Sequence, residues 1–257
     1  MNIIIYFLVA IVATTIGAAA GIGGGVIIKP VLDAVSSFSL PTVNLLSSST
    51  IFIMSIVSIG KQLMKKDKID IKRTTIIAGG SILGGIVGQK LLKVLVLKVP
   101  NKTLIMNIQS IMLIILLLFV FLYMNKSDKF KKYNLKSSFV ILILGVILGA
   151  IAAFLGIGGG PINVAIFTIF FNMEARDAAR NSIVVILFSQ GAKILSIACT
   201  TGFSSYNLSV LPVMLIGGVL GGFIGYRLNK TISEKNILKI FNSVLILIVL
   251  LNIYNIF

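Results

Sequence analysis

Two glycine-rich segments with the pattern Gly-x-Gly-Gly-Gly interrupt apolar stretches of the chain, at residues 21–25 and 156–160. Glycine tolerates positive φ and lets a ligand approach the backbone closely. At membrane depth, non-helical backbone persists only where protein buries it or where it lines a cavity. The glycines are Gly21, Gly23, Gly24 and Gly25 in the first segment, and Gly156, Gly158, Gly159 and Gly160 in the second.

A short apolar helix is predicted after each glycine segment, at Val26–Val35 and Pro161–Phe171. Pro161 suits a first helical position, where its missing N–H would be unpaired anyway. Each helix would direct free N–H groups and the positive end of its dipole at the break, and two such ends meeting near the membrane centre form an anion site. The alternative is close helix packing through small residues. The repetition of the segment favours the site.

Polar residues begin the helix that follows each short element. They are Asn44, Ser47, Ser48, Ser49 and Thr50 in the first half, and Asn181 and Ser182 in the second. We align Asn44 with Asn181. These side chains could complete a hydrogen-bonding shell around an oxyanion, or they could cap and link helices, and the sequence leaves both readings open.

Lys193 lies well inside the apolar run Asn181–Thr201. A lysine inside the membrane is costly and is a functional candidate by default. It could attract an anion, and it could also snorkel or meet a carbonyl. Its positional counterpart is Ile56, so such a role would belong to the second half alone. Lys29 is closer to a membrane surface and is expected to snorkel.

Several kinds of chemistry are excluded by residues that the chain lacks or places elsewhere. It has no histidine, and its one cysteine, Cys199, allows neither an internal disulfide nor a zinc motif. No acidic residue falls in the middle of a predicted span, and no nucleophile motif or Walker A motif is present. We therefore expect no enzyme activity, no metal and no cofactor.

The composition indicates that the chain is embedded in a lipid bilayer. Of 257 residues, 57% are hydrophobic and 12% are charged, against about 25% charged in a typical soluble domain. The net charge of +16 sits in short loops, as in membrane proteins, so no nucleic-acid partner is expected. We predict an all-α integral membrane protein with one transmembrane domain, 1–257. Its eight long apolar runs are Ile3–Ala20, Val43–Gly60, Thr74–Leu92, Thr103–Met124, Ser137–Leu155, Asn181–Thr201, Leu208–Leu228 and Asn236–Ile256.

The chain repeats itself. Besides the two glycine segments, a Gly-Gly-x-x-Gly pattern occurs at Gly84, Gly85 and Gly88 and again at Gly221, Gly222 and Gly225. Small residues at this helical spacing form a groove for a neighbouring helix. We infer two tandem repeats, 1–125 and 136–257, joined by a basic loop, 126–136.

The distribution of Lys and Arg bears on the topology. If all eight long runs cross the membrane, the loop charges divide almost evenly between the faces. If each half instead opens with a re-entrant hairpin followed by three crossings, the second half is inverted. One face then keeps only Lys90, Lys93, Lys98 and Lys102. The positive-inside rule makes the other face cytoplasmic, so both termini are expected outside the cytoplasm.

Four features together resemble the TauE/SafE family of sulfite exporter-like permeases. They are Gly21–Gly25 with Pro30, the basic loop with Lys68-Ile69-Asp70, the Gly84/Gly85/Gly88 helix, and the second copy at Gly156–Pro161. The chain departs from the family pattern at Ala165, where a later proline would fall, and at Ser48-Ser49-Thr50, near a usual Gly-Thr-Ser. The resemblance implies a permease of the bacterial or archaeal cytoplasmic membrane that exports or takes up sulfite, sulfonates or other small anions.

The expected function is a secondary transporter for a small anion, with sulfite, a sulfonate or a related sulfur-containing or organic anion as substrate. The expected partners are that anion and the lipid bilayer. Export from a negative interior gains about 2.3 kcal/mol per charge per 100 mV, so it needs no coupling carboxylate. The alternative is a structural or partner subunit of a membrane complex that does not itself transport.

Overall fold

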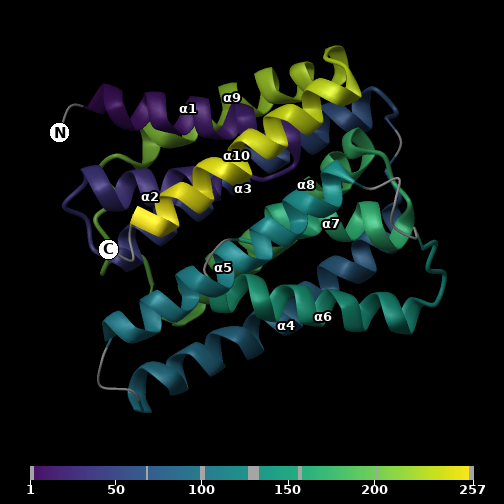
Figure 1. Cartoon of the computed structure of the whole chain (residues 1–257). Helices are drawn as coiled ribbons and strands as arrows, with labels where there is room; N and C mark the ends of the chain where they lie inside the picture. The colour runs from purple at the N-terminus through teal and green to yellow at the C-terminus, as the bar shows by residue number, and fades with distance from the viewer. Residues whose placement is uncertain are drawn as a thin grey trace.

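The computed structural model describes residues 3–67, 69–98, 102–126, 133–155, 158–200 and 202–254, and these ranges contain ten helices and no strand (Figure 1). The first five are α1 Ile3–Ala20, α2 Gly25–Val35, α3 Leu40–Met64, α4 Ile71–Lys98 and α5 Lys102–Asn125. The second five are α6 Ser138–Leu155, α7 Gly160–Phe171, α8 Ala175–Thr200, α9 Leu211–Thr231 and α10 Glu234–Tyr254.

Seven of the described helices are long and apolar enough to cross a bilayer: α1, α3, α5, α6, α8, α9 and α10. The eighth predicted run, Thr74–Leu92, does form helix α4, but its glycines and the polar pair Gln89 and Lys90 lower its hydropathy. The two short helices, α2 and α7, begin and end within one residue of the predicted bounds. The prediction of an all-helical integral membrane protein is confirmed.

Each short helix returns toward the end from which its long neighbour came. The ring of Tyr6, early in α1, lies 5.8 Å from the ring of Phe38, just after α2. In the second half, the backbone N–H groups of Tyr133 and Leu135, before α6, donate to the carbonyls of Ile169 and Phe170 at the end of α7. The pairs α1–α2 and α6–α7 are therefore hairpins, and Figure 1 shows them entering from opposite ends of the molecule.

Glycines allow close packing between helices of different halves, α1 against α9 and α6 against α4. Gly217, Gly221 and Gly225 of α9 lie against Ala10, Thr14 and Ala18 of α1, and the two helices run parallel. In the same way, Gly84 and Gly88 of α4 lie against Val146 and Ala150 of α6. The predicted groove is confirmed at these positions, although a Cβ on Gly85 would meet open space.

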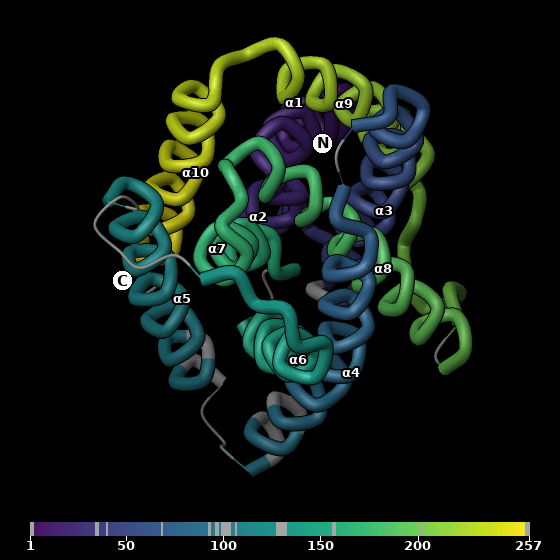
Figure 2. Tube along the Cα trace, turned by 90° about the vertical axis from the view of Figure 1, so that its right-hand side faces the viewer, coloured from purple at the N-terminus to yellow at the C-terminus, as the bar shows by residue number. Residues whose placement is uncertain are grey.

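The short helices occupy the centre of the bundle. One buried hydrophobic cluster surrounds α7 and a second surrounds α2, and Figure 2 shows both helices inside a ring of long ones. This burial satisfies the requirement that broken backbone at membrane depth be enclosed by protein.

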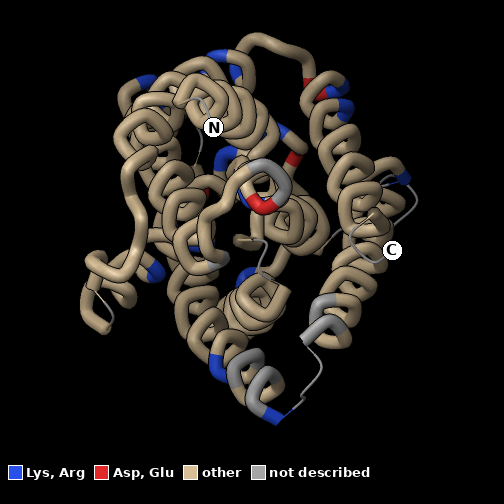
Figure 3. Tube along the Cα trace, turned by 90° about the vertical axis from the view of Figure 1, so that its left-hand side faces the viewer, with Lys and Arg blue, Asp and Glu red and all other residues tan. Residues whose placement is uncertain are grey.

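The basic connections lie at one end of the molecule, opposite the two termini (Figure 1). Figure 3 views the molecule from the end of the termini, with Lys and Arg outnumbering Asp and Glu. Asp67, between α3 and α4, accepts a hydrogen bond from the Tyr226 hydroxyl at 2.7 Å and pairs with Lys230 at 3.4 Å. Arg73 donates to the Asn134 amide oxygen at 2.9 Å. These contacts join the connections after α3, α5 and α9 at that one end.

Candidate functional site

The two glycine turns have the same backbone conformation. Gly23 and Gly24 have φ of +82° and +71°, and Gly158 and Gly159 have φ of +68° and +81°. Side-chain-bearing residues rarely adopt these angles, which explains the choice of glycine at these positions. Gly24 and Gly159 are the N-caps of α2 and α7. Gly156 lies outside the described residues.

The turns meet in the middle of the molecule. A Cβ on Gly160 would overlap the backbone of Ile22, so the second turn packs directly on the first. The buried Ser182 hydroxyl of α8 donates to the carbonyl of Gly21 at 2.6 Å, and its oxygen lies 3.4 Å from the carbonyl oxygen of Gly160. Ser182 thereby links the two turns. Pro161 follows Gly160 in the first turn of α7, as predicted.

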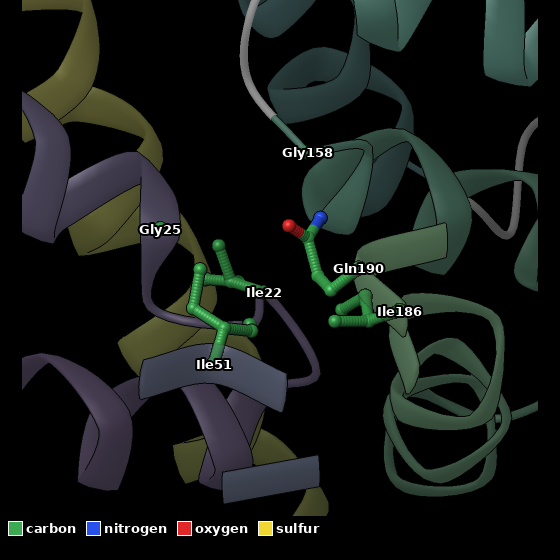
Figure 4. A pocket seen from close by; sticks show the side chains of 7 residues that line it. Ile22, Gly25, Ile51, Gly158, Ile186 and Gln190 are labelled. Carbon is green, nitrogen blue, oxygen red and sulfur yellow. The ribbon is translucent and has the colours of Figure 1, made fainter. Parts of the chain in front are cut away.

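A small pocket lies between the turns (Figure 4). Its lining residues are Ile22, Gly23, Gly25, Ile51, Gly158, Ile186 and Gln190, and its empty volume is about 160 Å³. The room left inside is that of about one water molecule. The two turns, α3 and α8 thus line one small space, to which both halves contribute.

Gln190 is the one polar side chain among the lining residues, and the sequence interpretation did not select it. Figure 4 shows its amide pointing into the space between Gly158 and Ile22. Its Nε2 atom lies 3.3 Å from the place where a Cβ on Gly158 would stand. An amide in the middle of an apolar span, one helical turn before Lys193, is the sequence signal that would have identified it.

The structure pairs the serines of the two halves more closely than the asparagines. Ser182 follows Gly160 at the same interval as Ser47 follows Gly25. The Ser47 hydroxyl oxygen lies 3.6 Å from the place of a Cβ on Gly25, beside the first turn. Ile51 and Ile186 each follow these serines by four residues, and both line the pocket. Ser48 is buried and Asn44 half-buried on α3, and neither lines the pocket.

The side-chain amide of Asn181 makes hydrogen bonds to other protein groups. Its amide oxygen accepts from the Thr74 hydroxyl at 2.7 Å and from the backbone N–H of Asp70 at 3.0 Å, and its amide nitrogen donates to the Asp177 carbonyl at 2.8 Å. These bonds tie α8 to the start of α4. Of the two readings that the sequence leaves open for Asn181, the geometry favours a link between helices.

Lys193 and Lys29 flank the pocket on the side that faces the termini. Lys193 stands one helical turn beyond Gln190, is half-buried, and has no ion-pair partner within the part of the chain that the structure describes. Lys29 pairs with Asp33 at 3.4 Å, and both side chains are about one-third exposed.

A buried cation lies on the opposite side of the first turn. Arg180 is 8% exposed, and its Nε donates to the amide oxygen of Asn229 at 3.0 Å. The amide nitrogen of Asn229 in turn donates to the carbonyl of Ala19, near the end of α1, at 2.8 Å. Arg180 lies just before the predicted apolar run Asn181–Thr201, and only the folded chain brings it beside Asn229.

A multi-pass helical membrane protein whose two helical hairpins bring paired glycine turns together at its centre has the architecture of a membrane transporter. Among the described residues, no cluster of acidic, histidine or cysteine side chains is placed to hold a metal ion. The chain belongs to the TauE/SafE family, because it matches the family described as "Sulfite exporter TauE/SafE" over residues 6–252.

Two curated relatives are similar to the chain over nearly their whole length. The "Probable membrane transporter protein YunE" of Bacillus subtilis is 26% identical, with 96% of each chain covered. The "Probable membrane transporter protein MJ0441" of Methanocaldococcus jannaschii is 27% identical, with 95% of this chain and 91% of the relative covered. No solved structure matches the chain.

Proposed function

We propose that this protein is a secondary transporter for a small oxyanion, and that the anion binds between the two glycine turns. The observation that carries the proposal is the pocket to which both turns contribute backbone, at Gly23 and Gly25 on one side and Gly158 on the other. The lining contains no acidic side chain, so nothing there repels an anion.

The backbone supplies the hydrogen-bond donors. The first N–H groups of a helix have no acceptor within that helix, and they carry the positive end of the helix dipole. The helices α2 and α7 both begin at this pocket, at Gly25 and Gly160. The Gln190 amide adds a side-chain donor, and Lys193 adds positive charge one turn away.

The size of the pocket implies that the site must open. Room for about one water is too little for an oxyanion of four heavy atoms. In an inverted-repeat transporter, one bundle rocks against the other around a central site. Separation of the turns at the contact between Gly160 and Ile22 would enlarge the pocket, so the structure corresponds to a closed state of the proposed cycle.

The charge distribution supports an orientation for the proposed inverted repeats 1–125 and 136–257. The end opposite the termini carries most of the described Lys and Arg residues in connections, which the positive-inside rule assigns to the cytoplasm. Reporter fusions at Phe257 are expected to show an extracytoplasmic C-terminus. A cytoplasmic C-terminus would contradict the orientation and leave the flux test below unaffected.

The proposed substrates are sulfite, a sulfonate or a related small organic anion in the cytoplasmic membrane of a bacterium or archaeon. The family name supports the sulfur chemistry, and the site itself supports a small oxyanion. The test is flux of labelled sulfite, sulfonates and carboxylates into proteoliposomes under an imposed potential. Saturable flux of at least one anion is expected, and no flux of any of them would favour the alternative of a non-transporting subunit.

A further inference from the structure

A second, larger pocket lies far from the glycine turns, at the end of the molecule that carries the basic connections. It has an empty volume of about 670 Å³ and opens between the first turns of α4 and α6. Its lining residues are Asp70, Lys72, Arg73, Ile76, Lys136, Ser138 and Ile141. Nothing in the proposed transport cycle uses this pocket.

The polar part of the pocket is strongly basic. Three cationic side chains face a single carboxylate, Asp70. Arg73 is held in place by Asp70 at 3.4 Å and by the Phe171 ring, whose centroid lies 5.4 Å away. Within the described ranges, Lys72 and Lys136 have no ion-pair partner, so their charges remain available to an anion.

Helix α6 adds backbone donors to the same place. Its first intrahelical bond joins the N–H of Ile141 to the carbonyl of Ser137. The N–H groups of Ser138 and the two residues after it therefore lack a partner within the helix. They lie beside Lys136, where the helix dipole also favours negative charge.

The deeper part of the pocket is apolar. It is formed by Ile76, which is half-buried on α4, and by Ile141, which is buried on α6. Phe139, next to Ser138, is 70% exposed on the outer surface. A free inorganic anion would gain nothing from these apolar groups, whereas a lipid would place its phosphate on the lysines and its acyl chains along the helices.

The corresponding positions at the other end of the molecule carry apolar residues. There α9 and α1 form the equivalent parallel pair. Their first turns carry the buried apolar residues Val210 and Tyr6 where the pocket has Arg73 and Ile141. The charge of Arg73 therefore has no counterpart at the other end, and the basic pocket lies at the face that the charge distribution assigns to the cytoplasm.

We propose that this pocket binds the phosphate headgroup of an anionic phospholipid of the cytoplasmic leaflet, with Lys72, Lys136 and the first turn of α6 as its donors. Basic pockets between transmembrane helices on this side of a membrane recognise such headgroups. A diester phosphate offers two free oxygens, which matches two separate lysines. The proposal is independent of which anion is transported.

Native mass spectrometry of the detergent-solubilised full chain, titrated with phosphatidylglycerol, tests the proposal. Each lysine near an anionic surface contributes about 1 kcal/mol, a factor of about five, so Lys72→Gln/Lys136→Gln should weaken binding roughly 30-fold. Lys90→Gln/Lys98→Gln is the matched control, since it removes two exposed lysines from the other end of α4 and should leave binding unchanged. Lys72→Arg/Lys136→Arg should retain it.

Three results would overturn the proposal. The first is equal affinity of the wild type and Lys72→Gln/Lys136→Gln, both eluting as folded protein. The second is equally tight binding of zwitterionic phosphatidylcholine, which would remove the role of charge. The third is displacement of phosphatidylglycerol by soluble glycerol phosphate at equal concentration, which would make the pocket a site for free anions.

Discussion

The two glycine turns share a motif and a backbone conformation, but their surroundings differ. At the first turn, the nearest atoms to a Cβ on Gly21, Gly23 or Gly24 would be 2.3–2.8 Å away, in Ala179, Ile186 and Ala13, closer than real contacts allow. At the second turn, the nearest atoms to a Cβ on Gly158 or Gly159 would be 3.3 Å away. The second turn is therefore packed less tightly than the first at Gly158 and Gly159, although Gly160 lies directly against Ile22.

This difference shows that one motif meets two requirements. At the first turn, glycine is needed both for its positive φ and for the absence of a Cβ. At Gly158 and Gly159 the positive φ is the dominant requirement, and the space beside Gly158 is where Gln190 reaches in. In the proposed site, the second half therefore contributes the polar side chain, while the first turn is tightly packed.

The largest expected effect comes from placing alanine at equivalent positions of the two turns. Gly24→Ala combines a left-handed backbone, which costs about 1–2 kcal/mol, with overpacking against the Ala13 carbonyl, which costs about 1–3 kcal/mol. Gly159→Ala carries mainly the first cost. Thermal inactivation of the two purified variants should show a clearly larger loss of stability for Gly24→Ala. Equal losses would mean that the two turns are packed alike.

Much of the fold is readable from the sequence. The hydrophobic runs predict α1 and α6 to within one residue, and the glycine segments predict where α2 and α7 begin. The Gly-Gly-x-x-Gly pattern correctly indicates helix grooves. These features depend on local periodicity and on backbone freedom, both of which a single sequence displays.

The partners of individual side chains are not readable in the same way. The sequence cannot indicate that α4 packs on α6 and α9 on α1, because each pair joins different halves. For this reason it could not assign Asn181 to Thr74. Arg180 and Asn229 lie in the same half, but 49 residues separate them, and only the folded chain brings them together. Gln190 was missed because its role depends on the direction in which it points inside the folded bundle.

The second prediction compares Gln190, the polar residue of the pocket, with Ser55, its counterpart in the first half. Gln190→Leu removes the one side-chain donor among the lining residues, and a hydrogen bond to an ion is worth about 1.5–3 kcal/mol. The apparent affinity for the transported anion should fall about 10- to 100-fold. The matched control is Ser55→Ala, at the equivalent position of α3, where the hydroxyl already donates to the carbonyl of Ile51 at 2.9 Å.

Initial transport rates over a range of anion concentrations in proteoliposomes would give the apparent affinity of both variants, Gln190→Leu and Ser55→Ala. An unchanged affinity in Gln190→Leu would place recognition on the backbone alone. A loss in Ser55→Ala as large as that in Gln190→Leu would mean that the two halves contribute equally.

The smallest expected effect concerns the two lysines beside the pocket. Lys193→Met removes a charge that has no ion-pair partner in the described ranges. At an effective dielectric near 20, such a charge stabilises a nearby anion by on the order of 1 kcal/mol. A decrease of about fivefold in apparent affinity is expected. Lys29→Met should change affinity less, because Asp33 already neutralises Lys29. The same flux assay at equal expression would compare the apparent affinities of the two variants. An unchanged affinity in Lys193→Met would mean that Lys193 only snorkels.

The most direct test of the central claim is whether the transported anion protects the pocket from chemical modification. Cys199 is the chain's one cysteine, so Cys199→Ser provides a background in which Gln190→Cys is the one thiol. The rate of its alkylation in proteoliposomes should fall severalfold when the anion carried fastest in the flux screen is present at saturation, and chloride should leave it unchanged. Equal alkylation rates with and without that anion, in a variant that still transports it, would contradict binding between the turns.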